Sequence, residues 1–301
     1  MNAPGTPVNA LPRRAVLAGL AALLGGASCS SRAPAARRIR VAAGADDIGR
    51  ELAALIDREL PGIGVSVVTT TASAAAVALV ERGETEIGFA QAGVLAPESP
   101  VTALARVYDD LLHLVVQADS PITTVADLRG RRVSVGAPGS GTAVAAGRLL
   151  AAARMPRDAY DRRELGLDDA TGALARGELD AFFFAGGLPV AGLRRLSDTL
   201  RIRLLDLSGW AGTLGSTVWN VPGSAYRTPP AATIADPTLL VASAAMPEDL
   251  AYDVTRLLLE HRDALAAAYP AIEALDLRSA IATMPLPLHP GAARYYRSVK
   301  P

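Results

Sequence analysis

Apolar positions follow two different spacings along the chain from residue 38 onward. Unbroken apolar runs of roughly four to eight residues predict buried strands, and apolar residues recurring every three or four positions predict helices. The expected strands are 39–43, 64–70, 86–90, 111–117, 132–136, 162–165, 179–184, 202–207 and 236–243, and the expected helices are 48–60, 74–82, 142–154, 168–176, 189–200, 247–268 and 272–282. Strands that alternate with helices predict an α/β fold with parallel β/α layers.

Two segments of the chain repeat one pattern. Residues 78–90 and residues 173–183 each end a helix at a glycine suited to the left-handed conformation, continue with an acidic residue and enter an apolar strand. The strands lead into the small-residue loops 91–93 and 185–187. Because ligands of open parallel sheets bind outside the carboxyl ends of the strands, two related halves with facing loops predict a two-lobed clamshell with a central cleft.

The loop between the predicted strand 132–136 and the predicted helix 142–154 is rich in glycine and small hydroxyl residues. It comprises Pro138, Gly139, Ser140, Gly141 and Thr142. One interpretation is a strand-to-helix turn in which Ser140 or Thr142 caps the helix. The other is an anion site, because the free N–H groups at a helix N-terminus favour negative charge.

The N-terminal segment has the order of zones that is typical of an export signal. Arg13 and Arg14 precede the apolar run 15–24, and small residues lead to Cys29, the only cysteine. The apolar run is too short to span a bilayer. We therefore expect a signal peptide over 1–28, possible export by the twin-arginine route, lipid attachment to Cys29 and a tether over 29–37. Cleavage nearby, with Cys29 as a bystander, is the alternative.

Composition and motifs exclude several classes of function. Half of the residues are hydrophobic, which is enough for a large core, and the formal net charge of zero argues against a nucleic-acid partner or an anionic membrane surface. We find no nucleophile–base pair, no phosphate-binding Gly-Lys-Ser/Thr motif and no metal-ligand spacing around His113, His261 and His289. No cofactor and no catalytic residue are expected. An enzyme built on a binding-protein fold remains an alternative, since one fold hosts many functions.

Several motifs, spread over nearly all of the chain after the tether, carry a resemblance to a known family. They are 104–108, 113–116, 125–133, 136–142, 177–183, 187–189 and 287–296. In their order and spacing the chain resembles the TAXI family, the extracytoplasmic receptors associated with TRAP-type secondary transporters. The resemblance implies a type II-like periplasmic-binding fold, with one lobe over 38–115 plus 215–301, the other over 118–214, and hinge crossovers at 115–120 and 207–215.

The resemblance also implies a function. Family members bind small carboxylates such as glutamate and pass them to a membrane permease driven by an ion gradient, so we expect a small anionic ligand and a TRAP-type permease as partners. A sensor without a transport role is the alternative. The chain departs from the family in the loops 43–48, 74–76 and 91–93, which have lost polar or aromatic residues. Ligand identity therefore does not carry over.

The resemblance decides between the two interpretations of the glycine-rich loop. We expect Ser140, Gly141 and Thr142 to hold the ligand carboxylate through backbone N–H groups and the two hydroxyls. The other expected contacts come from the remaining strand-end loops, although capping explains Asp46 and Ser73 equally well and Phe184 is expected as an apolar cleft wall. The full expected set is Gly44, Asp46, Ser73, Gln91, Pro138, Gly139, Ser140, Gly141, Thr142, Phe184 and Gly187.

Overall fold

The computed structural model describes residues 37–43, 48–70 and 73–300. The predicted signal peptide, Cys29, Gly44 and Asp46 lie outside these residues. The strands are β1 (Arg37–Ala43), β2 (Ile63–Thr69), β3 (Ile87–Gln91), β4 (Val101–Gln117), β5 (Arg132–Ser134), β6 (Asp161–Arg163), β7 (Ala181–Gly186), β8 (Ile202–Leu204), β9 (Thr217–Val221) and β10 (Ala231–Ser243). The α-helices are α1 (Ile48–Glu59), α2 (Ser73–Glu81), α3 (Gly141–Ala152), α4 (Leu167–Ala175), α5 (Ala191–Thr199), α6 (Ala211–Leu214), α7 (Glu248–Glu260), α8 (Arg262–Ala268), α9 (Leu277–Ala280) and α10 (Pro290–Ser298).

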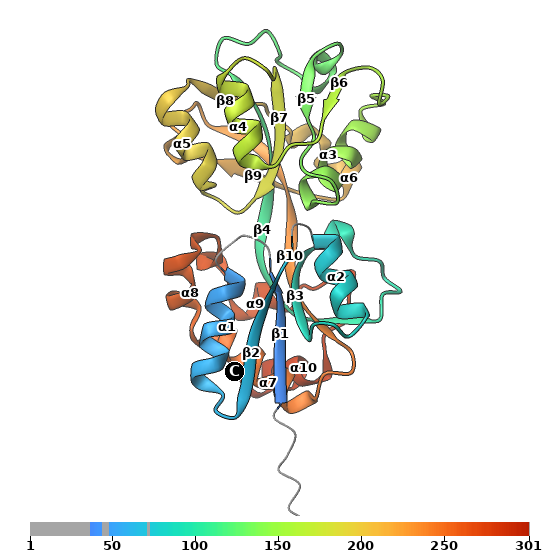
Figure 1. The fold of residues 1–301 in the computed structure, drawn as a ribbon, viewed down its shortest axis with the longest axis vertical. Helices are drawn as coiled ribbons and strands as arrows, with labels where there is room; N and C mark the ends of the chain where they lie inside the picture. Colours follow the sequence, from blue (N-terminus) through green and yellow to red (C-terminus); the bar gives the residue numbers. More distant parts are fainter. Residues whose placement is uncertain (1–36, 44–47, 71–72, 301) are drawn as a thin grey trace, which may run out of the picture. The chain divides into compact units, whose positions relative to one another are not determined.

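One mixed sheet runs through two lobes. Its main path follows the order β2-β1-β3-β10-β4-β7-β5-β6, while β8 pairs with β4 and β9 pairs with β10. The long strands β4 and β10 are antiparallel neighbours, and both continue from one lobe into the other (Figure 1). The protein therefore has the two-lobed α/β fold that the sequence predicted.

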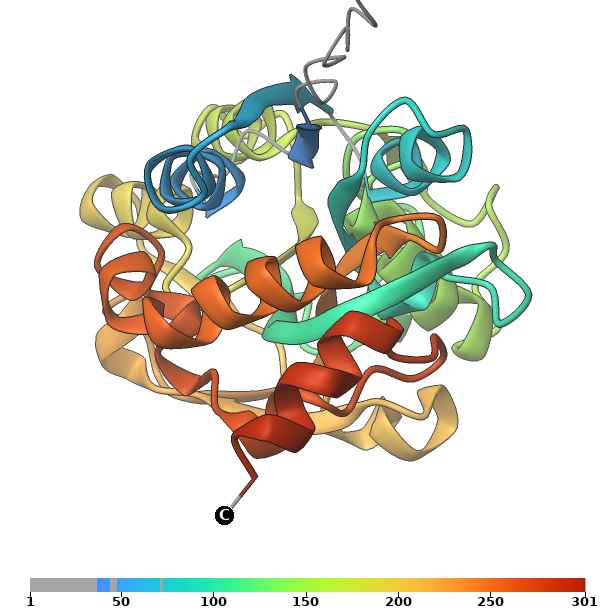
Figure 2. The same ribbon diagram turned by 90° about the horizontal axis from the view of Figure 1, so that it is seen from below.

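Each lobe has its own core. In the first lobe, one face of the sheet packs against α1, α7 and α8, and α1 presents Ile48, Leu52 and Ile56 to this core because they lie on one side of the helix. In the second lobe the two faces carry separate clusters, one against α3 and the other against α4 and α5. Seen from below, α7 and α10 of the first lobe lie side by side (Figure 2).

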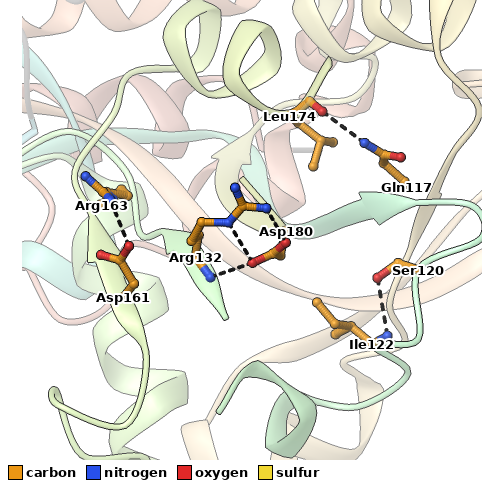
Figure 3. Close-up of polar contacts among 8 residues, drawn as sticks. All are labelled: Gln117, Ser120, Ile122, Arg132, Asp161, Arg163, Leu174 and Asp180. Carbon is orange, nitrogen blue, oxygen red and sulfur yellow. Dashed lines mark hydrogen bonds and ion pairs between the residues drawn. The ribbon is translucent and has the colours of Figure 1, made fainter. Parts of the chain in front are cut away.

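The repeated sequence pattern produces the same local structure twice. Gly83 and Gly177 both adopt a left-handed conformation, with φ of 67° and 71°. A further acidic residue, immediately before the following strand, then forms an ion pair with an arginine of a neighbouring strand. Glu86 accepts from the Arg40 backbone N–H and guanidinium. Asp180 accepts from the corresponding groups of Arg132, with the Nη2–Oδ1 distance at 2.7 Å (Figure 3).

The lobe boundaries differ from those that the sequence predicted. Residues 215–235 were expected in the first lobe, but Val221 and Tyr226 pack in the same cluster as Phe182 of the second lobe. The predicted hinges 115–120 and 207–215 lie inside the second lobe, where β4 pairs with β7 and β8. On β4, Tyr108 packs in the core of the first lobe and Leu111 in the core of the second. On β10, Ala235 packs in the second-lobe core and Leu239 in the first. The chain therefore crosses between the lobes within these two short segments.

Several elements also differ in length. β4 begins at Val101 and β10 at Ala231, both earlier than predicted. Their first halves contain polar residues, alanine and threonine instead of an unbroken apolar run, so the sequence carries no strand signal there. Their burial comes from their position in the sheet. The helix expected over 247–268 is two helices that meet at His261. The segment 272–282 contains only a 3₁₀ turn and the four-residue α9, and α10 was not predicted.

Candidate ligand-binding site at the junction of the lobes

The predicted anion loop lies at the start of α3, with its hydroxyl groups already engaged. Ser140 is the N-cap: its Oγ accepts from the Ala143 N–H at 3.1 Å and donates to the Ala137 carbonyl at 2.7 Å. The single proton of the Ser140 hydroxyl is thus committed, as the capping interpretation expects. Pro138 and Gly139 are exposed, whereas Gly141 and Thr142 are buried.

The Thr142 hydroxyl connects α3 to the end of β7. Its Oγ1 accepts from the Ala185 N–H at 3.0 Å, which leaves the hydroxyl proton able to donate. The N–H groups of Gly141 and Thr142 belong to the first turn of the helix, where no carbonyl of the same helix precedes them. Two backbone donors and one hydroxyl donor therefore remain for an anion at this helix end.

Gln91 of the first lobe lies against this helix end. Its side chain is buried at the end of β3, and its Nε2 donates to Asp110 Oδ2 at 2.5 Å. Asp110 Oδ2 also accepts from Thr238 Oγ1 at 2.8 Å. A Cβ at Gly141 would lie 1.9 Å from Gln91 Oε1, so only glycine permits this approach of the two lobes.

A second contact between the lobes lies about two helical turns further along α3. A Cβ at Gly93 would lie 2.4 Å from Asp236 Oδ2 and 2.9 Å from Arg148 Nη1. Arg148 Nη1 is 3.5 Å from Asp236 Oδ2, and its Nη2 donates to the Leu214 carbonyl at 2.8 Å. Burial raises the pKa of Asp236, while the charge of Arg148 acts in the opposite direction.

A small cavity lies beside Arg148 and Asp236 of the second contact. Its volume of about 20 Å³ is room for one water molecule. It is lined by Asp110, Leu112, Ala145, Arg148, Ala185, Leu214, Ser216, Ile234, Ala235 and Asp236. Small-molecule sites usually measure roughly 300–1,000 Å³, so a ligand at this junction requires the lobes to separate first.

The remaining predicted residues lie around the junction in different roles. Gly187 follows β7, and a Cβ there would lie 2.4 Å from Ala271 Cβ of the first lobe, so this glycine permits a further close contact. Phe184 is half-buried and packs against the second-lobe core rather than standing free as a wall. Ser73 is the half-buried first residue of α2. The structure thus brings Gln91 together with Gly141, and leaves Pro138 and Gly139 at the surface.

His113 is a structural histidine, buried and with both ring nitrogens engaged. Its Nδ1 lies 3.3 Å from the Phe184 carbonyl and its Nε2 lies 3.1 Å from Tyr226 Oη. Tyr226 Oη in turn accepts from the Val190 N–H at 3.0 Å. Nδ1 therefore carries the proton, and Tyr226 donates to Nε2. Burial lowers the pKa of His113 to about 4.

Sequence reasoning missed the charged residues of the junction, namely Asp110, Arg148 and Asp236. Each had a signal: Asp110 and Asp236 interrupt apolar strands, and buried carboxylates are rare unless they have partners. Within the described part of the chain, no group of three or more histidine, cysteine and acidic side chains could hold a metal ion. No helix in that part is long and apolar enough to cross a membrane.

Comparison with solved structures identifies the class of protein that has this fold. The periplasmic aliphatic sulphonate binding protein SsuA from Escherichia coli is similar at 19% identity and a TM-score of 0.52, over 88% of this chain and 80% of that one. A putative L-cystine ABC transporter protein from Listeria monocytogenes is similar at 14% identity and a TM-score of 0.54, over 79% of this chain and 97% of that one. The GluR0 ligand-binding core from Nostoc punctiforme, in complex with L-glutamate, is similar at 14% identity and a TM-score of 0.50, over 78% and 99%. The fold is that of the periplasmic binding proteins.

The family follows from the sequence itself. Residues 47–299 match the NMT1-like family, and this range is most of the chain. The protein belongs to the NMT1-like family.

Proposed function

We propose that this protein is an extracytoplasmic receptor that captures a small ligand with a carboxylate group for a membrane transporter. The observation that carries the proposal is the start of α3, which lies at the junction of the lobes. There two backbone N–H groups and the Thr142 hydroxyl can donate to an anion at the positive end of the helix dipole. The binding-protein fold and the export signal predicted over 1–28 support it.

A thermal-shift screen of the purified chain over carboxylates, amino acids, sulfonates and inorganic anions tests the ligand class. Binding to the native state raises the melting temperature, by an amount that grows with ligand concentration above Kd. Carboxylates are expected to raise it, and direct calorimetry confirms each hit. If only non-anionic compounds stabilise the protein, the proposed ligand class is wrong. Chromatography of the same samples detects any conversion of the compound, which would favour the enzyme alternative.

The TRAP type of transporter is the finer part of the proposal and rests on the resemblance to the TAXI family. Uptake of the identified ligand into vesicles that contain the cognate permease should collapse when the ion gradient is dissipated. Uptake that instead follows ATP hydrolysis would assign the receptor to an ABC transporter. Ligand that binds without any uptake would favour the sensor alternative.

Attachment to the membrane through Cys29 is a separate part of the proposal. A single acyl chain holds a protein only marginally, so more than one chain on the cysteine is expected. Mass spectrometry of the protein extracted from membranes should show a mature N-terminus at Cys29 that carries lipid. A soluble form that starts after Cys29 would contradict lipid anchoring, and Cys29→Ala is the matched control for release from the membrane.

A further inference from the structure

The amide of Gln91 lies against Gly141, the first residue of α3. Its orientation is determined at one end, because Nε2 donates to Asp110 Oδ2. The opposite end, Oε1, is therefore the atom that faces Gly141, 1.9 Å from where a Cβ would be. An uncharged oxygen, the negative end of the amide dipole, thus lies beside the first residue of α3, next to the helix N-terminus that attracts negative charge.

The Gln91 amide is held in a buried setting. The Gln91 side chain and Asp110 are both less than a tenth exposed, at 6% and 7%. Asp110 Oδ2 is shared with the Thr238 hydroxyl, so the carboxylate is anchored from β10 as well as from Gln91. The amide lies so close to Gly141 that even a Cβ has no room between them, so a ligand cannot contact this side of Gly141 while the amide is there.

We infer that Gln91 is an internal occupant of the α3 site, which a ligand must displace, and that it sets the affinity for ligand. This inference rests on the proposed function. The occupied conformation joins β3 of the first lobe to α3 of the second and competes with binding. Since only the unoccupied fraction of the protein can bind, the apparent Kd exceeds the intrinsic Kd by the inverse of that fraction.

The contacts of Gln91 also define the class of ligand that displaces it best. The amide places its oxygen beside the helix N-terminus and donates an N–H to Asp110. A ligand with a carboxylate beside an ammonium or N–H group replaces both contacts. A simple carboxylate replaces only the first and brings no donor in place of the hydrogen bond from Gln91 to Asp110. Amino acids are therefore expected to bind more tightly than the corresponding acids without the amino group.

The first test asks whether Gln91→Ala tightens or weakens ligand binding, measured by calorimetry. The probes are two pairs, L-glutamate with glutarate and L-alanine with propionate. Removal of the internal occupant should tighten binding of any probe that the wild type binds, by about tenfold if the occupied state makes up about nine-tenths of the protein. Weaker or unchanged binding would overturn the inference, because a side chain that contacts the ligand directly loses affinity when it is removed. Equal affinity for both members of a pair would overturn the ligand class.

Gln117→Ala is the matched control. The Gln117 amide donates to the Leu174 carbonyl at 3.0 Å inside the second lobe (Figure 3), away from α3, so its removal deletes an amide hydrogen bond without freeing the site. Affinity of the control should equal that of the wild type.

The second test needs no ligand and separates failure of this inference from failure of the proposed function. Small-angle scattering of the unliganded protein should give a larger radius of gyration for Gln91→Ala than for the wild type and Gln117→Ala, because the contact between the lobes is lost. An unchanged radius would overturn the inference. A larger radius together with no binding of any carboxylate or amino acid to the wild type would support the internal contact and reject the proposed receptor function.

Discussion

At the scale of single residues, the hydroxyl of Thr142 illustrates how one side chain can serve both structure and binding. It accepts from the Ala185 N–H and so holds α3 against the end of β7, while its proton can still reach an anion. Ser140 lacks this freedom, because its proton is donated to Ala137 and its oxygen caps α3. Of the two hydroxyls expected at the ligand, only that of Thr142 retains a donor.

Thr142→Ala is therefore expected to lower both stability and affinity. The Ala185 N–H loses its partner, which should reduce the free energy of unfolding by about 1–3 kcal/mol in urea denaturation. Loss of the hydroxyl donor should weaken binding of the screened ligand by about ten- to a hundredfold. Thr142→Ser is the control, since it retains the hydroxyl. Unchanged affinity in a folded Thr142→Ala variant would remove Thr142 from the site.

His113 predicts how stability depends on pH. Its pKa is about 4 in the folded protein against an ordinary value of 6.5, so between these values the unfolded chain binds a proton that the folded chain does not. Stability is therefore fully present above pH 6.5 and falls as the pH drops towards 4, by at most about 3 kcal/mol. Burial also lowers the pKa of His289, which acts in the same direction.

Urea denaturation between pH 7 and pH 4 measures this dependence. His113→Gln cannot take up the proton and should show a flatter pH profile, whatever its stability at pH 7. Tyr226→Phe, which removes the donor to Nε2 but keeps the ring, should leave the slope in place. An identical slope in His113→Gln and the wild type would assign the pH dependence to other groups.

At the scale of elements, close helix packing depends on particular glycines. Gly291, in the first turn of α10, lies against α7, and a Cβ there would be 2.1 Å from the Glu248 carbonyl. Gly147 lies in the middle of α3, where a Cβ would meet nothing within 4 Å. Alanine at these two positions therefore separates the effect of helix packing on the free energy of unfolding from the effect of helix propensity.

Gly291→Ala should lower the free energy of unfolding by about 1–3 kcal/mol, because the backbones of α7 and α10 must move apart. Gly147→Ala should raise it by about 0.4–1 kcal/mol, because alanine loses less conformational entropy on folding. Both values can be measured by urea denaturation at neutral pH. A stabilising Gly291→Ala would show that α10 shifts without cost, contrary to the packing described.

At the scale of the whole molecule, β4 and β10 are the covalent connections between the lobes. Any movement of one lobe relative to the other must therefore bend these two strands. The register of their pairing shifts on both sides of Leu239 and Leu240, close to the crossing between the cores. Such irregularities bend strands locally, which favours this position as the hinge. Ligand that touches both lobes only when they are together shifts the population towards that state.

The expected result is a decrease in the radius of gyration of Gln91→Ala when the screened ligand is added, and little change for the wild type, whose lobes Gln91 already joins without ligand. Small-angle scattering with and without saturating ligand measures both. The same radius at saturation, in the wild type and in Gln91→Ala alike, would show a rigid protein and contradict the receptor mechanism.

The sequence by itself determined the α/β alternation, most of the strands and helices, and the repeated pattern in which Gly83 and Gly177 end a helix before a buried strand. These features follow from apolar spacing, glycine conformation and neighbouring charges, which act over a few residues. Only the tertiary structure decided the lobe boundaries and the partners of the junction. The first halves of β4 and β10 have no strand pattern of their own. They are strands because the first half of β4 pairs with the second half of β10 and the first half of β10 pairs with β9. The contact of Gln91 with Gly141 and Asp110 joins positions that are remote in the chain, so no local pattern could predict it.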